Sequence, residues 1–217
     1  ISQMNHPGDT FGDFYDFALY NPAFDAVIDL IEVGNGEGTV HQAGYFPSYQ
    51  YYTKALDKGW HLAPTNNQDN HLGHWRDSNT ARTVILATEL TEASLYDAMR
   101  NRRVYATEDN DLSIIYTLND LIMGTISDSD AATATIKVQI SDPTDPIGST
   151  VEVIVNGGVV AASATTSAQN EVITFSIPNN YTYYYIRIVQ PDTDTAVTAP
   201  VWTGDIEHAG ISSVKTD

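Results

Sequence analysis

The hydrophobic and polar positions follow one pattern up to about residue 112 and another beyond it. In the first part, apolar runs of strand length alternate with amphipathic helical patterns: strands at residues 1–4, 26–33, 60–65 and 83–88, helices at residues 47–58 and 91–102. Gly59 ends the first helical pattern and Thr91 precedes the second, as is typical of helix ends and N-caps. Residues 1–112 therefore predict an α/β fold with a parallel sheet or barrel.

From about residue 113 the helical patterns disappear. Segments of alternating apolar and polar residues predict strands with one buried face at residues 114–118, 133–140, 151–155, 159–164, 172–177 and 183–189. Asn156-Gly157-Gly158 is typical of a tight hairpin. Residues 113–204 thus predict an all-β immunoglobulin- or fibronectin-like sandwich, in which Tyr183-Tyr184-Tyr185 has both a core and an exposed face. Residues 205–217 are expected to form a polar tail.

Composition narrows the classes of function. The 28 acidic residues outnumber the 10 basic ones and give a net charge of −18, which repels nucleic-acid backbones. Cysteine is absent, which excludes disulfides, thiolate catalysis and cysteine-ligated zinc. No apolar run approaches the roughly 20 residues of a membrane span. The sandwich and the lack of cysteine together predict an extracellular or cell-surface location.

Three side chains at the ends of predicted strands are candidate metal ligands. Asp69 and His71, one residue apart, follow the strand at residues 60–65, and His6 follows the first strand. A carboxylate with neutral imidazoles suits Zn²⁺, Mn²⁺ or Fe²⁺, and three ligands leave positions open for water, as in catalytic sites. Taken alone, His6 could simply cap a strand end, and Asp69 and His71 could belong to an asparagine-rich turn.

Several segments resemble a known family when they are taken in order. They are His6-Pro7, Ile31-Glu32-Val33-Gly34-Asn35, Asp69-Asn70-His71-Leu72-Gly73-His74-Trp75, Arg82-Thr83-Val84 and Arg103-Val104-Tyr105-Ala106-Thr107. This order resembles PHP-domain metal-dependent phosphoesterases, in particular the secreted CehA/McbA-like branch. The resemblance covers residues 1–112 and implies the C-terminal part of a distorted (βα)7 barrel with Zn, Mn or Fe ions at its strand ends.

The resemblance also implies roles for single residues. His6, Asp69 and His71 would be metal ligands, and Glu32 and Asn35 would support the ligands or contact substrate. His74 and Arg82 are further substrate candidates, and Arg82 could grip a phosphate or form a salt bridge. The implied function is metal-dependent hydrolysis of phosphate esters by a metal-activated water. The acidic surface favours a small phosphate-ester substrate.

This chain departs from the family pattern because the family's His-x-His pair and its further ligands do not precede Ile1. The resemblance therefore implies an incomplete fragment, inactive alone, whose partner is the missing N-terminal half of the barrel. Self-association through the exposed barrel surface is the other expected contact.

Two other functions stay open: a non-catalytic extracellular glycan- or protein-binding module with a vestigial metal site, or a sandwich that only braces the barrel. Trp75 and Arg76 could form a substrate rim or a packed loop. Glu108, Asp109 and Asp111 could bind Ca²⁺, but their spacing fits no EF-hand, which favours a solvated loop.

Overall fold

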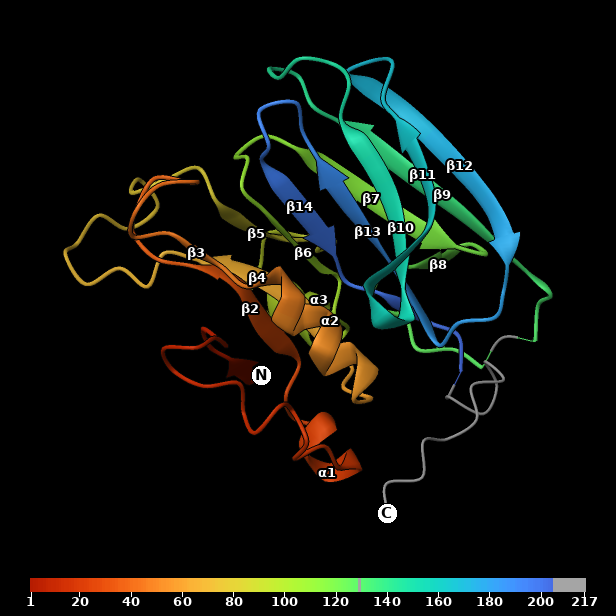
Figure 1. Ribbon diagram of the computed structural model, residues 1–217, viewed down its shortest axis with the longest axis horizontal. Helices are drawn as coiled ribbons and strands as arrows, with labels where there is room; N and C mark the ends of the chain where they lie inside the picture. Colours follow the sequence, from red (N-terminus) through yellow and green to blue (C-terminus); the bar gives the residue numbers. More distant parts are fainter. Residues whose placement is uncertain (129, 205–217) are drawn as a thin grey trace.

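The computed structural model describes residues 1–128 and 130–204, and three β-sheets dominate the fold (Figure 1). The predicted polar tail lies outside these described residues. The described residues contain three α-helices, which are α1 (Pro22–Asp25), α2 (Tyr49–Asp57) and α3 (Glu92–Arg100), and none of them is long and apolar enough to cross a membrane. The predicted α/β class, with part of a (βα)7 barrel, is therefore wrong.

The first sheet has four strands. Its strands β1 (Gln3–Met4), β2 (Leu30–Asn35) and β4 (Ala63–Asn67) run parallel, and β3 (Phe46–Pro47) lies antiparallel to the end of β2. All six residues of β2 are buried, as expected for a central parallel strand covered on both faces. Because the three strands are parallel, their carboxyl ends lie at one edge of the sheet.

The other two sheets form a sandwich. One has the order β11-β10-β13-β14-β6-β5 with β15 on β13, and the other has the order β12-β9-β7-β8. The first contains β5 (Arg82–Ile85), β6 (Val104–Thr107), β10 (Thr150–Val155), β11 (Val159–Thr165), β13 (Tyr183–Val189), β14 (Thr195–Thr198) and β15 (Val201–Trp202). The second contains β7 (Ser113–Leu118), β8 (Leu121–Ile122), β9 (Thr133–Ser141) and β12 (Asn170–Pro178).

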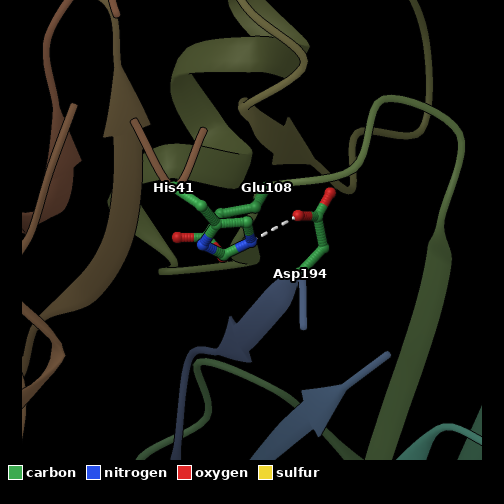
Figure 2. A group of neighbouring side chains, drawn as sticks. All are labelled: His41, Glu108 and Asp194. Atoms are coloured by element: carbon green, nitrogen blue, oxygen red, sulfur yellow. Dashed lines mark hydrogen bonds and ion pairs between the residues drawn. The ribbon is translucent and has the colours of Figure 1, made fainter. Parts of the chain in front are cut away.

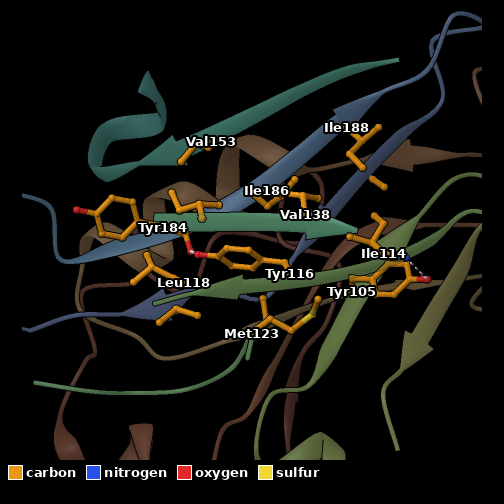
Figure 3. Packing of buried hydrophobic residues seen from close by; sticks show 14 of the residues in the cluster. Tyr105, Ile114, Tyr116, Leu118, Met123, Val138, Val153, Tyr184, Ile186 and Ile188 are labelled. Atoms are coloured by element: carbon orange, nitrogen blue, oxygen red, sulfur yellow. Dashed lines mark hydrogen bonds between the residues drawn. The ribbon is translucent and has the colours of Figure 1, made fainter. Parts of the chain in front are cut away.

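The main hydrophobic core lies between these two sheets (Figure 3). Tyr116 of β7 and Val138 of β9 belong to it together with Val153 of β10 and Ile186 of β13, and all four are fully buried. The alternation predicted for these strands follows from this arrangement, because every second side chain of β7 and β9 points into the core.

Strands β5 and β6 were expected in the barrel but belong to the sandwich. β6 pairs antiparallel with β14, with Ala106 opposite Val197, and β5 pairs antiparallel with β6. A parallel barrel would need a crossover between them that returns each strand in the same direction. Helix α3 lies between β5 and β6 in the chain, but here the two strands meet in opposite directions.

Helix α2 joins the first sheet to the sandwich. Its buried Tyr52 and Leu56 share one hydrophobic cluster with Ile31 of β2 and Tyr185 of β13. At its end, Asp57 accepts hydrogen bonds from the Tyr183 hydroxyl at 2.7 Å and from the Gly157 N–H in the turn after β10. The predicted exposed face of Tyr183-Tyr184-Tyr185 is therefore wrong. Tyr183 and Tyr185 are buried in the cluster that includes α2, and Tyr184 is buried in the core between the two sandwich sheets.

The pair formed by Asp25 and His61 makes stability depend on pH. The Asp25 carboxylate accepts hydrogen bonds from the His61 backbone N–H and imidazole Nδ1, both at 2.7 Å. Burial favours the protonated acid, but these bonds and the charge of Arg102 outweigh it and lower the pKa of Asp25 below its usual value. The carboxylate therefore stabilises the fold above about pH 4, and this contribution is lost as the pH falls below that.

We expect Asp25→Asn to lower the free energy of unfolding at pH 7 by about 1.5 kcal/mol, because the charged acceptor is lost. The difference from the wild type should shrink as the pH falls from about 5 to 3. Urea unfolding across this range measures it. Asp120→Asn is the control, since Asp120 forms an exposed pair with Lys137 worth at most about 1 kcal/mol. A difference that stays constant with pH would contradict this account.

Candidate functional site

Glu32 lies at the centre of the carboxyl edge of the parallel strands. Its side chain is buried and comes from β2, between β1 and β4. One oxygen, Oε2, accepts hydrogen bonds from the His6 backbone N–H at 2.5 Å and from the Asn35 amide at 3.0 Å. The other, Oε1, accepts one from the Asn67 amide at 2.9 Å. Glu32 thus ties together the ends of all three strands.

His6 presents a free ring nitrogen at this edge. Its Nδ1 is buried and has no hydrogen-bond partner among the described residues, and its ring lies 4.4 Å from that of Phe11. His6 and Asn35 line a cavity of about 340 Å³ together with Phe46 and Tyr51. A buried imidazole nitrogen without a partner costs free energy unless a ligand or metal meets it, so His6 is suited to coordination.

Asp69 and His71 lie on the loop that follows β4. Their side chains are 47% and 78% exposed, and Asp69 Oδ1 lies 3.9 Å from His71 Nε2. The His71 backbone N–H donates to Glu37 Oε1, which places this loop beside the chain that follows β2. Within the described part of the chain, the ligand atoms of His6, Asp69 and His71 do not lie within 4.8 Å of one another. The structure pairs two of the three expected ligands.

Two arginines line a groove beside Asp69. The groove has a volume of about 380 Å³, and Arg76, Arg82 and Trp75 form part of its wall. Arg82 donates through Nη1 to the backbone oxygens of Asn79 and Ala81, at 2.8 and 2.7 Å. The expected alternative, a salt bridge to Arg82, is absent among the described residues.

His74, the other expected substrate contact, lies on the same loop. Its side chain is 68% exposed and its Nδ1 is 3.9 Å from Asp77 Oδ1. The neighbouring Trp75 is 78% exposed, so it is not a packed tryptophan. The loop therefore offers its polar and aromatic side chains to solvent and to whatever enters the groove.

A second group of candidate ligands joins segments far apart in the chain. His41, Glu108 and Asp194 bring one imidazole and two carboxylates together, and His41 Nε2 lies 2.7 Å from Asp194 Oδ1 (Figure 2). Burial raises the pKa of Asp194 more than the hydrogen bond from His41 lowers it. Glu108 accepts from the Tyr45 hydroxyl at 2.9 Å and from the Thr195 N–H at 2.7 Å.

Both Glu108 oxygens are therefore already hydrogen-bonded, and the group acts as a junction between the first sheet and the sandwich. Tyr45 also accepts from the Asn66 amide at 2.9 Å, which extends the network to the end of β4. The expectation of a solvated loop at Glu108 and Asp109 is wrong, because both are buried. Their position in the chain, directly after a strand, was the available signal.

A third group consists of carboxylates alone: Asp109, Asp142 and Asp145. Asp142 and Asp145 lie in the sequence Ser141-Asp142-Pro143-Thr144-Asp145, which was not identified from the sequence as a candidate site. Burial and the charges of Asp109 and Asp142 raise the pKa of Asp145 to about 6. Two aspartates three residues apart in a turn between strands were the signal that could have found this group.

Comparisons with known proteins do not place the chain in a family. No family model matches it, and no curated protein matches it. A crystal structure of an engineered protein shares 15% sequence identity and a TM-score of 0.28, over 93% of this chain and 47% of that chain. The chain thus spans about half the length of that protein, and a TM-score this low carries no argument.

Proposed function

We propose that this chain carries part of the active site of a metal-dependent hydrolase of small phosphate esters, at the carboxyl edge of its parallel strands. The observation that carries the proposal is the buried Nδ1 of His6, which has no partner in the described residues and lies at the edge that Glu32 organises. Ligand sites in parallel sheets commonly form at the carboxyl ends of strands.

By residue type, the donor set suits a borderline divalent cation, although the structure does not bring the three side chains together. His6 Nδ1 and the side chains of Asp69 and His71 would supply two imidazoles and a carboxylate, which suit Zn²⁺, Mn²⁺ or Fe²⁺. When bound, such an ion supplies Lewis acidity toward a phosphate oxygen and lowers the pKa of water. Glu32 holds the backbone of His6 and the amide of Asn67, so it positions the ends of β1 and β4 on either side of the site.

The charges around the groove support a phosphate ester as substrate. The chain has only 10 lysines and arginines against 28 acidic residues, yet Arg76 and Arg82 both line the groove beside Asp69. Guanidinium groups bind phosphate oxygens through paired hydrogen bonds. The surrounding negative charge repels large polyanions, so a small phosphate ester suits this groove better than a nucleic acid.

We expect the 217-residue chain to bind Mn²⁺ in calorimetric titration, and His6→Asn to weaken this binding at least about tenfold. The Mn²⁺-loaded chain should then bind inorganic phosphate. His74→Asn is the matched control for Mn²⁺ binding, because His74 is exposed beside Asp77 on the same loop and is not among the proposed ligands.

Equal Mn²⁺ affinity in the wild type and His6→Asn would overturn the proposed ligand set. Mn²⁺ binding that is lost in His6→Asn, but without phosphate binding, would overturn the phosphoesterase and favour the non-catalytic module. Because this chain carries only part of the proposed active site, binding of phosphate rather than hydrolysis of an ester is the readout.

A further inference from the structure

Three loops meet at a group of carboxylates that the proposed active site does not use. Asp109 follows β6, Asp142 and Asp145 follow β9, and Gln190 follows β13. One carboxylate oxygen from each of the three aspartates lies within 4.8 Å of those of the other two. Asp109, Asp142 and Gln190 are all buried, so the group is built into the fold rather than spread on its surface.

The side-chain amide of Gln190 does not satisfy the three carboxylates around it. Its Nε2 lies 2.9 Å from Asp109 Oδ2, 3.0 Å from Asp142 Oδ2 and 2.8 Å from Asp145 Oδ2. A primary amide has two N–H groups, so it cannot give each of three carboxylates its own hydrogen bond. Its Oε1 is buried without a partner among the described residues, although Gln190 is only 2% exposed.

If the amide is turned over and a cation occupies the centre of the group, Oε1 gains a partner and two N–H groups no longer have to serve three carboxylates. The Nε2 amide group then takes the place that Oε1 holds now. The two ends of a glutamine amide have nearly the same shape, so the turn needs no new space. Oε1 would then face the cation together with the three carboxylates. A cation would also balance the negative charge of the three aspartates. No lysine or arginine in the described residues forms an ion pair with them.

The chemistry of the ligands selects the cation. Carboxylate and amide oxygens alone are the ligands of hard ions, and zinc prefers sites that include nitrogen or sulfur. Calcium accepts six to eight oxygens in flexible geometry, whereas magnesium demands a near-ideal octahedron and keeps several waters. Asp111 adds to the oxygen supply, since its Oδ1 is buried without a partner in the described residues while its Oδ2 accepts from Thr144.

We propose that Asp109, Asp142, Asp145 and Gln190 form a calcium site that fixes three loops at one end of the sandwich. Its ligands come from both sheets, because β6 and β13 belong to one sheet and β9 to the other. Calcium therefore holds the two sandwich sheets together near the connection from β6 in one sheet to β7 in the other.

The test is thermal unfolding and calorimetric titration of the full chain after treatment with a chelator. We expect the midpoint of unfolding to rise with CaCl₂ concentration, because calcium binds the folded chain, and to rise less with equal MgCl₂. Asp145→Asn should weaken calcium binding at least about tenfold. Asp120→Asn is the matched control, because it removes one exposed carboxylate elsewhere in the chain and should leave calcium binding unchanged.

A second variant keeps the test decisive if Asp145→Asn does not fold. Gln190→Glu adds a fourth carboxylate and should bind calcium more tightly than the wild type, while unfolding at lower temperature without calcium. The proposal is overturned if calcium leaves the midpoint unchanged, or if calcium and magnesium raise it equally in the wild type and in Asp145→Asn. The latter result would mean that divalent ions only screen the acidic surface.

Discussion

Replacing Glu32 by alanine is expected to lower the free energy of unfolding by about 3 kcal/mol and to weaken Mn²⁺ binding by about 10- to 100-fold. The first effect follows from burial. The carboxylate is 3% exposed and accepts three hydrogen bonds, from the His6 N–H, the Asn35 amide and the Asn67 amide. Without it, these donors lose a charged acceptor, and Asn35 is itself buried.

The second effect follows from position. Glu32 is the only side chain in the described residues that accepts hydrogen bonds from both His6 and Asn67, so its loss frees the end of β1 from the end of β4. Metal ligands whose relative positions are no longer fixed bind the ion more weakly. Urea unfolding measures the stability, and calorimetric titration with Mn²⁺ measures the affinity.

Two further variants separate these effects. Glu32→Gln keeps the volume and one oxygen acceptor, so we expect a smaller loss of stability than with alanine. Glu92→Ala is the matched control, because Glu92 is exposed in the first turn of α3 and contributes at most about 1 kcal/mol through the helix dipole. If Glu32→Ala binds Mn²⁺ as tightly as the wild type, Glu32 does not position the metal ligands.

Replacing Tyr116 by alanine is expected to lower the free energy of unfolding by about 4 kcal/mol. The ring is fully buried in the core of the sandwich, and its hydroxyl donates to the Tyr184 backbone oxygen at 3.0 Å, from one sheet to the other (Figure 3). Alanine would leave a cavity between the sheets and an unpaired carbonyl. Chemical unfolding monitored by circular dichroism measures the change.

Tyr116→Phe divides this loss into its parts. It removes only the hydroxyl, so we expect a loss of about 1 kcal/mol, and the rest of the alanine effect belongs to the ring. Tyr96→Ala is the control on an exposed aromatic, since Tyr96 is 43% exposed on α3. Equal losses in Tyr116→Ala and Tyr96→Ala would contradict the assignment of Tyr116 to the main core.

Local signals in the sequence predicted single elements well. The helix expected at residues 47–58 is α2 (Tyr49–Asp57), and the predicted cap Thr91 accepts a hydrogen bond from the Ser94 N–H at the start of α3. The strand expected at residues 151–155 lies within β10 (Thr150–Val155). These signals depend on residues one to four positions apart, which interact in the same way whatever the rest of the fold is.

The fold class was predicted wrongly because the sequence indicated the strands but not how they pair. An apolar run such as Arg82–Ile85 has the same pattern whether it pairs parallel in a barrel or antiparallel in a sandwich. Alternation of helix and strand favoured the parallel arrangement, but β5 and β6, which α3 connects in the chain, pair directly with each other in opposite directions. The four residues of β6 are all buried, so this strand is covered on both faces, and its own sequence does not show which segments supply that cover.

Sequence spacing by itself indicated candidate ligands that lie close together in the chain. Asp69 and His71 were found because one residue separates them. His41 and Asp194 are 153 residues apart, and Gln190 is 81 residues from Asp109, so no local pattern joins the residues of either pair. His41 lies in a glycine-rich loop and Gln190 follows a strand, and nothing in their neighbourhoods distinguishes them from other polar residues.

The sequence by itself determined the short-range features: the bounds of α2 and α3 to within a few residues, six strands of the sandwich (β7, β9, β10, β11, β12 and β13), the hairpin at Asn156-Gly157-Gly158 and the strongly acidic charge. The tertiary structure alone decided which sheet β5 and β6 join, the burial of Tyr183 and Tyr185 against α2, and the meeting of Asp109 with Gln190. The reason is physical. Helix caps and strand alternation arise from neighbouring residues, whereas sheet pairing and ion clusters arise from contacts between distant segments, and many arrangements satisfy the same local pattern.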